Sequence, residues 1–328
     1  MRARKFLLVL LVALATATSS TWAATKAELA AFATRVAKQH KLDEQWVRKT
    51  LAQAKLKQAV RNAYKRTAES KPWSQYRPIF VTTKRAQAGH RFWRKHDAEM
   101  RRAESQYGVP AAIIAAIIGV ETFYGTYTGK YRVLDSLYSL AFYNWKRKKF
   151  FTRELEQFLL LSAEGHVDPL TIKGSYAGAM GLPQFISSSY RAYSVDFDGD
   201  GKRNLLTSEA DAIGSVAAYL DRHGWQAGAP ITAPTTAAAA YDVAPYKRNK
   251  KPKVAISKLR AAGVKAFARL PAKTPAMVVR LRGSAGPEDW VALRNFYVIT
   301  RYNHSALYAM AVYQLADLIA ELQAKHAQ

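Results

Sequence analysis

The feature that most constrains this fold is a segment, Val109–Val120, without a single charged or hydrogen-bonding side chain. From Ala111 onward it is apolar on every face of a helix, which predicts a helix buried in the core rather than one at the surface. Gly108 ends the preceding helix, and Pro110 is tolerated in the first turn of the next. The rest of the chain has to pack around this helix.

Glu121 follows this apolar segment directly. A carboxyl group in such surroundings is partly desolvated, and desolvation raises its pKa toward neutrality, where it can donate and then accept a proton. Glu121 is therefore a candidate catalytic acid and base. The alternative is an ion-paired glutamate at a helix end.

Composition narrows the class of protein. A chain of 328 residues, 49% of them hydrophobic, is long and apolar enough for a globular fold with a sizeable core. The absence of cysteine excludes disulfides, a thiol nucleophile and lipid attachment through an N-terminal cysteine. Residues 1–23 have the basic, apolar and small-residue regions of a signal peptide cleaved after Ala23. We expect an exported, non-lipidated periplasmic protein with no transmembrane segment in the mature chain.

The net charge of +26 requires an anionic partner or environment. Every ionisable group from Lys247 to Arg282 is Lys or Arg. Export argues against nucleic acid as the partner and favours an anionic wall polymer or membrane surface. The alternative is an ordinary solvated surface.

Periodicity predicts a mainly α (α+β) fold with a small β-containing insert. The expected parts are a signal peptide (1–23), an N-terminal helical segment (24–70), a helical core (71–226), a small basic β-containing subdomain (227–300) and a C-terminal helix that packs back on the core (301–328). Residues 71–78 read as a loop, and 276–282 and 295–300 as strands.

Two loops have the residue types of binding sites. Gly174, Gly178 and Gly181 allow close backbone approach beside Ser175 and Gln184, which suits a floor for a sugar; the alternative is a tight turn. The segment lacks the Gly-Lys-Ser/Thr ending of a phosphate loop, and Ser175 does not lie in the Gly-x-Ser-x-Gly elbow of a serine hydrolase.

The second loop has carboxylates at positions 1, 3 and 5 of a calcium loop, a glycine at 6 and a backbone carbonyl at 7. Position 12 is Thr207 instead of Glu, so Asp211 would have to reach back. The predicted ligands are Asp196, Asp198, Asp200, the Lys202 carbonyl and Asp211. The alternative is a turn held by Asx hydrogen bonds. The scattered histidines exclude a His-Glu-x-x-His zinc site.

Five motifs in unbroken order closely resemble the lytic murein transglycosylase B family over residues 71–320: GVETFYG (119–125), GSYAGAMG with QF (174–185), VDFDGDG (195–201), DAIGSVA (211–217) and NFYVITRYNHS (295–305). The resemblance implies a lysozyme-like helical catalytic core. It also implies cleavage of the β-1,4 bond between N-acetylmuramic acid and N-acetylglucosamine without water, leaving a 1,6-anhydro end. Glu121 would be the single acid and base, whereas ordinary glycosidases use two carboxylates. Asp135, the nearest candidate for a second, is expected to cap the helix that starts at Ser136.

By motif position, the resemblance also implies residues that hold the glycan: Tyr76, Lys146, Arg147, Ser175, Gln184, Tyr302, Asn303 and Tyr308. No cofactor is implied for the chemistry, and Ca²⁺ would be structural. The expected partners are peptidoglycan glycan strands and other cell-wall enzymes, and no nucleic acid is expected to bind. We expect the protein to be a monomer. Tyr124 departs from the family, where Trp is common.

Two further readings stay open at this point. One is a hydrolytic muramidase with the same groove, and the other is a non-catalytic, calcium-stabilised peptidoglycan-binding protein.

Overall fold

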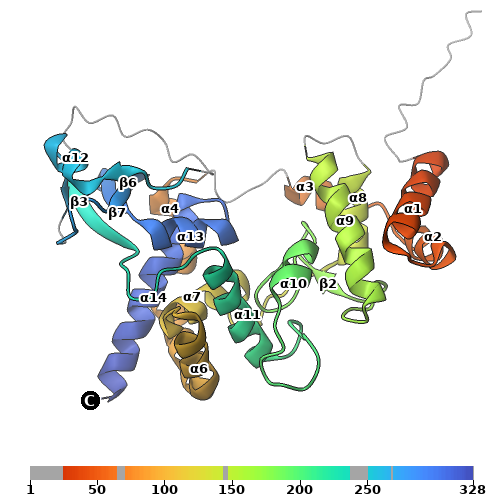
Figure 1. The fold of residues 1–328 in the computed structure, drawn as a ribbon, viewed down its shortest axis with the longest axis horizontal. Helices are drawn as coiled ribbons and strands as arrows, with labels where there is room; N and C mark the ends of the chain where they lie inside the picture. The colour runs from red at the N-terminus through yellow and green to blue at the C-terminus, as the bar shows by residue number, and fades with distance from the viewer. Residues whose placement is uncertain (1–24, 65–70, 143–146, 237–249, 267–268, 328) are drawn as a thin grey trace, which may run out of the picture.

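The computed structural model is mainly helical with few strands, which confirms the predicted fold class (Figure 1). The structure describes residues 25–64, 71–142, 147–236, 250–266 and 269–327. The predicted signal peptide lies outside them. The helices are α1 (Lys26–His40), α2 (Glu44–Ala52), α3 (Gln58–Tyr64), α4 (Trp73–Phe80), α5 (Thr83–Lys95), α6 (Asp97–Tyr107), α7 (Ala111–Thr122), α8 (Val133–Ala141), α9 (Lys148–Ala163), α10 (Ser187–Tyr193), α11 (Glu209–Arg222), α12 (Ile256–Ala261), α13 (Arg294–Tyr302) and α14 (Ala306–Ala327).

The strands are β1 (Tyr131–Arg132), β2 (Lys173–Gly174), β3 (Thr232–Thr236), β4 (Val254–Ala255), β5 (Lys265–Ala266), β6 (Pro275–Arg282) and β7 (Pro287–Ala292). In the part of the chain that is described, no single helix is long and apolar enough to cross a membrane. Only α6 and α7 pass that test as a pair, and a bend of 113° separates them.

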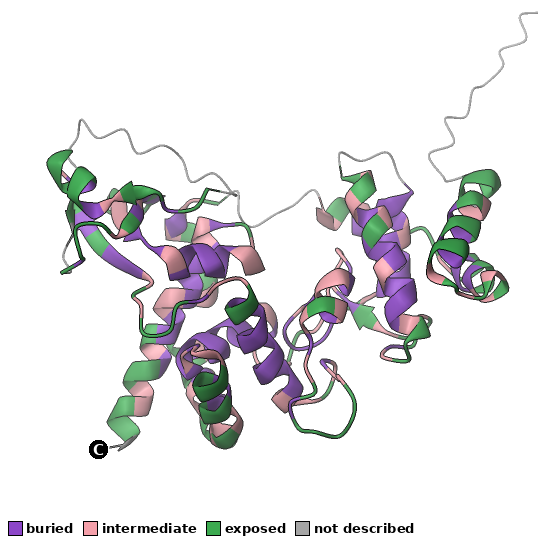
Figure 2. Cartoon of the chain, viewed as in Figure 1, coloured by how far each residue is buried: buried purple, intermediate pink, exposed green. Residues whose placement is uncertain are grey.

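Helix α7 is the centre of the core, as its apolar sequence predicts. All of its residues are buried except Glu121, and Ile114, Ile117 and Ile118 are fully shielded from solvent. Each fully buried isoleucine side chain stabilises the fold by about 1.5–3 kcal/mol relative to an exposed one. Helices α5, α6, α11 and α14 surround α7. Figure 2 shows buried residues filling the faces of α9 and α11, with exposed residues on α1 and the last turns of α14.

The N-terminal helices α1 and α2 pack on each other, and a buried carboxylate joins α1 to α9. Glu156 of α9 accepts a hydrogen bond from Arg35 Nη2 at 2.8 Å and contacts His40 Nε2 at 2.6 Å. The hydrogen bonds from these two partners, with their charges, outweigh burial and lower the pKa of Glu156.

The five-stranded sheet has the order β4-β6-β7-β3-β5, and all neighbouring strands are antiparallel. It has its own small core, which includes Ile256, Val278 and Val291. Trp73 of α4 donates a hydrogen bond to Glu288 Oε2 at 3.2 Å, which attaches the sheet to the helical part. Strand β6 confirms the strand predicted at 276–282.

Three local predictions were wrong. Residues 295–300 belong to helix α13, where all six are buried, so alternation and β-branching carried no information on secondary structure. Residues 73–80 form helix α4 rather than a loop; Pro72 is its N-cap and Pro78 lies inside it. Asp135 does not cap α8, because Arg132 is the N-cap. Asp135 Oδ1 instead accepts from the Lys55 amide at 2.7 Å and pairs with Arg132.

Candidate active site

Glu121 lies in the last turn of α7, directly before an unusual stretch of backbone. Phe123, Tyr124 and Gly125 have φ angles of 51°, 56° and 87°, all in the left-handed region. Side chains with a Cβ rarely adopt this region, at a cost of order 1–3 kcal/mol each, and such strain gathers at functional sites. The strain ends α7 sharply, so the Glu121 carboxyl group stands at the edge of the core.

Two side chains hold this strained end of α7. Thr122 Oγ1 donates to the Leu182 carbonyl at 2.9 Å and accepts from the Gly125 amide at 3.0 Å. Arg85 of α5 donates to the Gly119 carbonyl, and its guanidinium lies 4.9 Å from the centre of the Phe123 ring. Glu121 is thus fixed from the α5 side and from the Gly-rich segment.

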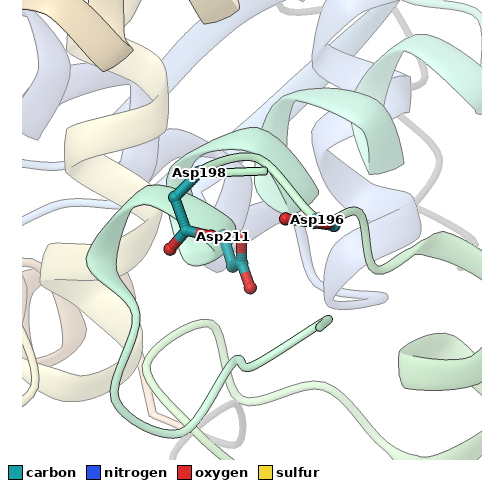
Figure 3. Close-up of side chains that lie close together, drawn as sticks. All are labelled: Asp196, Asp198 and Asp211. Atoms are coloured by element: carbon teal, nitrogen blue, oxygen red, sulfur yellow. The ribbon is translucent and has the colours of Figure 1, made fainter. Parts of the chain in front are cut away.

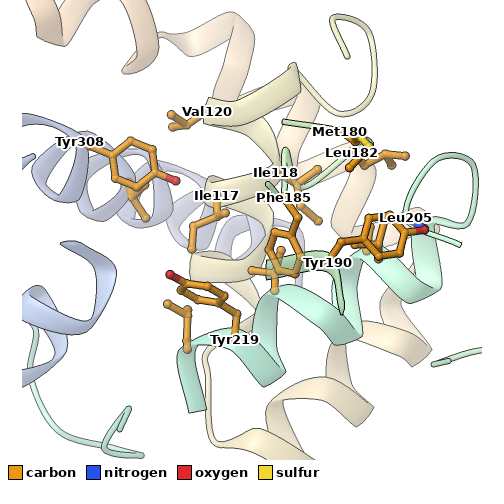
Figure 4. Close-up of a cluster of buried hydrophobic side chains, with 14 of the residues drawn as sticks. Ile117, Ile118, Val120, Met180, Leu182, Phe185, Tyr190, Leu205, Tyr219 and Tyr308 are labelled. Atoms are coloured by element: carbon orange, nitrogen blue, oxygen red, sulfur yellow. The ribbon is translucent and has the colours of Figure 1, made fainter. Parts of the chain in front are cut away.

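Tyr308 of α14 binds the Glu121 carboxyl group directly. Its hydroxyl donates a hydrogen bond of 2.7 Å to Glu121 Oε1, and the ring is 1% exposed. Figure 4 shows this ring projecting from α14 beside Val120. Tyr302 stacks parallel to Tyr308 with ring centres 6.3 Å apart. Burial, and then the negative charge of Glu121, raise the pKa of both tyrosines well above the ordinary value, so both stay protonated donors.

Ser175 and Gln184 shape the Gly-rich segment beside this site. Ser175 Oγ accepts from the Ala177 and Ala179 amides at 3.2 and 3.0 Å. The backbone of Gln184 is in the left-handed region, with a φ angle of 49°. Its side-chain Nε2 donates to the carbonyls of Thr128 and Gly181 at 3.0 and 2.9 Å. The segment is therefore a tight turn stabilised by these hydrogen bonds, and it carries the side chains of Ser175 and Gln184.

The other predicted glycan-holding residues fall into two groups. Tyr76 is buried in α4, a helix that packs on α14, the helix of Tyr308. Tyr302 donates to the Pro183 carbonyl at 2.5 Å, and Asn303 is the C-cap of α13. These residues gather with Glu121 around the end of α7. Arg147, by contrast, is an exposed residue at the start of α9 whose guanidinium stacks 3.9 Å from the Phe150 ring centre, and Lys146 lies outside the described residues.

The acidic loop brings together three of its predicted carboxylates. Oxygens of Asp196, Asp198 and Asp211 lie within 4.8 Å of one another (Figure 3). Asp211, fully buried at the start of α11, accepts from the amides of Phe197 and Asn204, each at 2.6 Å. Burial raises its pKa.

Asp200 is not part of this cluster, and its Oδ1 accepts from the Lys202 amide at 2.8 Å. The three clustered carboxylates offer the hard oxygen donors that calcium prefers. Each ionised carboxylate has about four lone-pair positions, so Asp211 keeps acceptor capacity beside its two amide bonds.

Comparison with known proteins identifies the chain. The family described as "Transglycosylase SLT domain" matches residues 24–317. Over 300 residues the chain is 42% identical to membrane-bound lytic murein transglycosylase B of Escherichia coli K12, covering 88% of this chain and 81% of that protein. The chain belongs to the lytic murein transglycosylase B family. It is a peptidoglycan lytic transglycosylase, as its family resemblance predicted.

Solved structures of the family agree with the fold. The chain matches lytic transglycosylase SltB1 of Pseudomonas aeruginosa with a TM-score of 0.85 and 45% identity, covering 91% of this chain and 99% of that one. It matches E. coli lytic transglycosylase Slt35 in complex with calcium with a TM-score of 0.81 and 41% identity, covering 90% and 93%. The lysozyme-like core is thereby confirmed.

Sequence reasoning missed two residues that build this transglycosylase site. Arg85 gave no signal, because a single arginine on an amphipathic helix is indistinguishable from a surface residue. Tyr219 of α11 packs its ring 4.9 Å from Tyr302 and donates to the Arg301 carbonyl at 2.6 Å. The sequence signal for Tyr219 was its place in a helix rich in small apolar residues.

Proposed function

We propose that Glu121 is the single acid and base of this lytic transglycosylase, and that it acts on the bond between N-acetylmuramic acid and N-acetylglucosamine. The observation that carries the proposal is the hydrogen bond from buried Tyr308 to Glu121 Oε1. A carboxyl group fixed by such a bond can be presented to a substrate in a defined direction.

The chemistry then needs two proton transfers. Protonated Glu121 gives its proton to the glycosidic oxygen, and the bond from that oxygen to the muramoyl anomeric carbon breaks. The resulting carboxylate takes the proton of the muramoyl 6-hydroxyl as O6 bonds to the same carbon. The products are a free 4-hydroxyl and a 1,6-anhydro end, Glu121 is protonated again, and no water enters.

Asp135 is unsuited to serve as a second carboxylate, because it is held by the Lys55 amide and the Arg132 side chain. Glu121 is also the carboxylate whose charge acts on both Tyr302 and Tyr308. These observations favour the anhydro-forming reaction over a two-carboxylate hydrolysis.

The glycan strand would be held by residues around Glu121. We assign contacts with sugar to Ser175, Gln184 and Asn303, while Tyr76 and Tyr302 support Tyr308 from behind. Exposed Arg147 offers a cation for the lactyl or peptide carboxylates of the strand, with Lys146 as its neighbour in sequence.

Calcium would be a structural ion in this transglycosylase. Asp196, Asp198 and Asp211 would be its side-chain ligands, and the Slt35 relative was solved in complex with calcium. The ion would attach the loop to the start of α11, since Asp211 lies in the first turn of that helix. Asp200, which lies outside the cluster, would join as a ligand only after a local rearrangement, and the Lys202 carbonyl would be a further ligand.

The proposed location is the periplasm, without a lipid anchor, and the proposed partners are peptidoglycan strands and other cell-wall enzymes. The absence of cysteine and the pattern of residues 1–23 support this. The named E. coli relative is membrane-bound, so fractionation of cells that express the full chain would decide the point.

The deciding experiment is the mass of products released from purified sacculi. The wild type should release muropeptides that are lighter by one water than the corresponding hydrolysis products, and Glu121→Gln should release none. Glu321→Gln, a change of the same kind at an exposed position of α14, should match the wild type. Reducing ends of full mass would instead show a muramidase, and activity of Glu121→Gln would remove this residue from the chemistry.

A further inference from the structure

A pocket lies at the seam between the five-stranded sheet and the helical core. Its walls come from the loop after α11, the segment before β4, the turn before β6 and the start of α13. We call it the seam pocket; it is lined by Gln226, Ala229, Pro230, Lys251, Pro252, Thr274, Pro275, Leu293 and Arg294. Its volume of about 250 Å³ is below the ~300 Å³ at which pockets for whole small molecules begin. The seam pocket therefore suits the end of a larger ligand.

Hydrogen bonds hold these walls in place. Fully buried Asn295 accepts from the Gln226 amide at 2.8 Å and donates to the Gln226 and Ala229 carbonyls at 2.8 and 2.9 Å. Arg294 donates to the carbonyls of His223 and Gly224 at 3.1 and 3.2 Å. A pocket formed in advance binds with less loss of conformational entropy.

The seam pocket is positively charged and has no acidic lining residue. Lys251 Nζ and the Arg294 guanidinium lie 5.9 and 5.5 Å from the centre of the Tyr297 ring, and Arg301 lies 4.2 Å from it. Among the described residues, no ion pair joins Lys251 or Arg294 to a carboxylate. The like charges of Lys251 and Arg294 repel each other, and an anion bound between them would relieve this.

Helix α13 adds to the positive potential of the pocket. Its N-cap, Leu293, and its first residue, Arg294, both line the cavity. Leu293 has no side-chain acceptor for the amides of the first turn, and no side-chain cap is present. The amides of an uncapped helix start and the helix dipole both favour an anion at this place.

The rest of the lining is mostly apolar, with three prolines, Ala229 and Leu293 beside the polar side chains of Gln226 and Thr274. We propose that the seam pocket binds the free carboxylate at the end of a short peptide with small apolar side chains, of the kind that peptidoglycan stems carry. Lys251 and the start of α13 would face the carboxylate, and the prolines would contact the methyl groups. The choice of a wall peptide as ligand rests on the proposed function.

The test is a titration of the full chain with N-acetyl-D-alanyl-D-alanine and with its C-terminal amide, followed by NMR or calorimetry. The free carboxylate should bind at least about tenfold more tightly than the amide, which is the weakening expected for loss of a charge-assisted contact. Lys251→Gln should weaken binding of the carboxylate by a similar factor. Lys253→Gln is the matched control, because Lys253 is an exposed neighbour outside the pocket lining, and it should bind like the wild type.

Other outcomes would overturn the assignment. Equal binding of acid and amide, no binding of the acid, or equal weakening by Lys251→Gln and Lys253→Gln would exclude a specific carboxylate site. Loss of binding in Glu121→Gln would move the probe to the catalytic site, again against the proposal. Anhydro products from sacculi without any binding of the dipeptide would refute the seam pocket alone and leave the proposed function intact.

Discussion

Replacing Tyr308 by Phe removes one hydroxyl and one hydrogen bond, the 2.7 Å bond to Glu121 Oε1, and keeps the buried ring. A hydrogen bond to a charged group contributes about 1.5–3 kcal/mol. Since 1.36 kcal/mol is a factor of ten in rate, Tyr308→Phe should lower kcat by roughly 10- to 150-fold. KM should change little, because the hydroxyl orients the acid rather than the glycan.

The assay is the initial rate of anhydro-muropeptide release over a range of sacculus concentrations. Tyr302→Phe is the matched control, since it removes a neighbouring hydroxyl that donates to the Pro183 carbonyl instead of to Glu121. The control should lose stability of about 0.5–1.5 kcal/mol with a smaller change in kcat. The reasoning fails if folded Tyr308→Phe keeps kcat within twofold of the wild type, or if the two variants lose kcat equally.

Three further predictions concern stability. Chelation of calcium should lower the Tm of the wild type, because an ion present at 100 times its Kd stabilises the fold by about 2.7 kcal/mol. Calorimetry should find no such drop in Tm for Asp198→Asn, and an unchanged wild-type Tm would exclude a bound ion. Burial lowers the pKa of His223 below its unfolded value of about 6.5, so its contribution to the free energy of unfolding is present above that pH and is lost as pH falls through the folded pKa. The fall of Tm with acid should therefore be shallower in His223→Gln than in the wild type, and identical Tm profiles would contradict this. Gly181→Ala should lower the denaturation midpoint more than Gly199→Ala, because both glycines have positive φ but only the first Cβ would meet a backbone atom, the Leu205 carbonyl oxygen at 2.2 Å; equal shifts would mean that φ alone matters.

The sequence predicted the parts of the fold that depend on one-dimensional pattern. Helix α7 was predictable because a segment apolar on every face has no other stable place than the core. Residues 295–300 were not, because all six are buried, and so short a run of aromatic and β-branched residues suits a buried strand as well as a helix. The loop predicted around Tyr76 failed for a related reason: two prolines suggested a break, whereas Trp73 and Tyr76 are buried on a short helix.

The candidate site divides in the same way. Glu121 could be singled out because an apolar segment precedes it directly in the sequence, and the acidic loop because its carboxylates lie close together along the chain. The hydrogen bond to Tyr308 spans 187 residues, and the family resemblance implied only that Tyr308 belongs to the site, not this bond. Arg85 and its bond to Gly119 could not be predicted, because nothing local separates a half-buried arginine on α5 from the exposed ones beside it.

That long separation has a consequence for when the enzyme becomes active. Glu121 is synthesised long before α14, which supplies Tyr308. A chain that is still being synthesised therefore has its candidate acid but not the hydroxyl that binds it, and the side of α7 on which α14 packs is uncovered. The site is complete only after α14 has been made and has docked, so the order of elements along the chain delays its assembly to the end of synthesis.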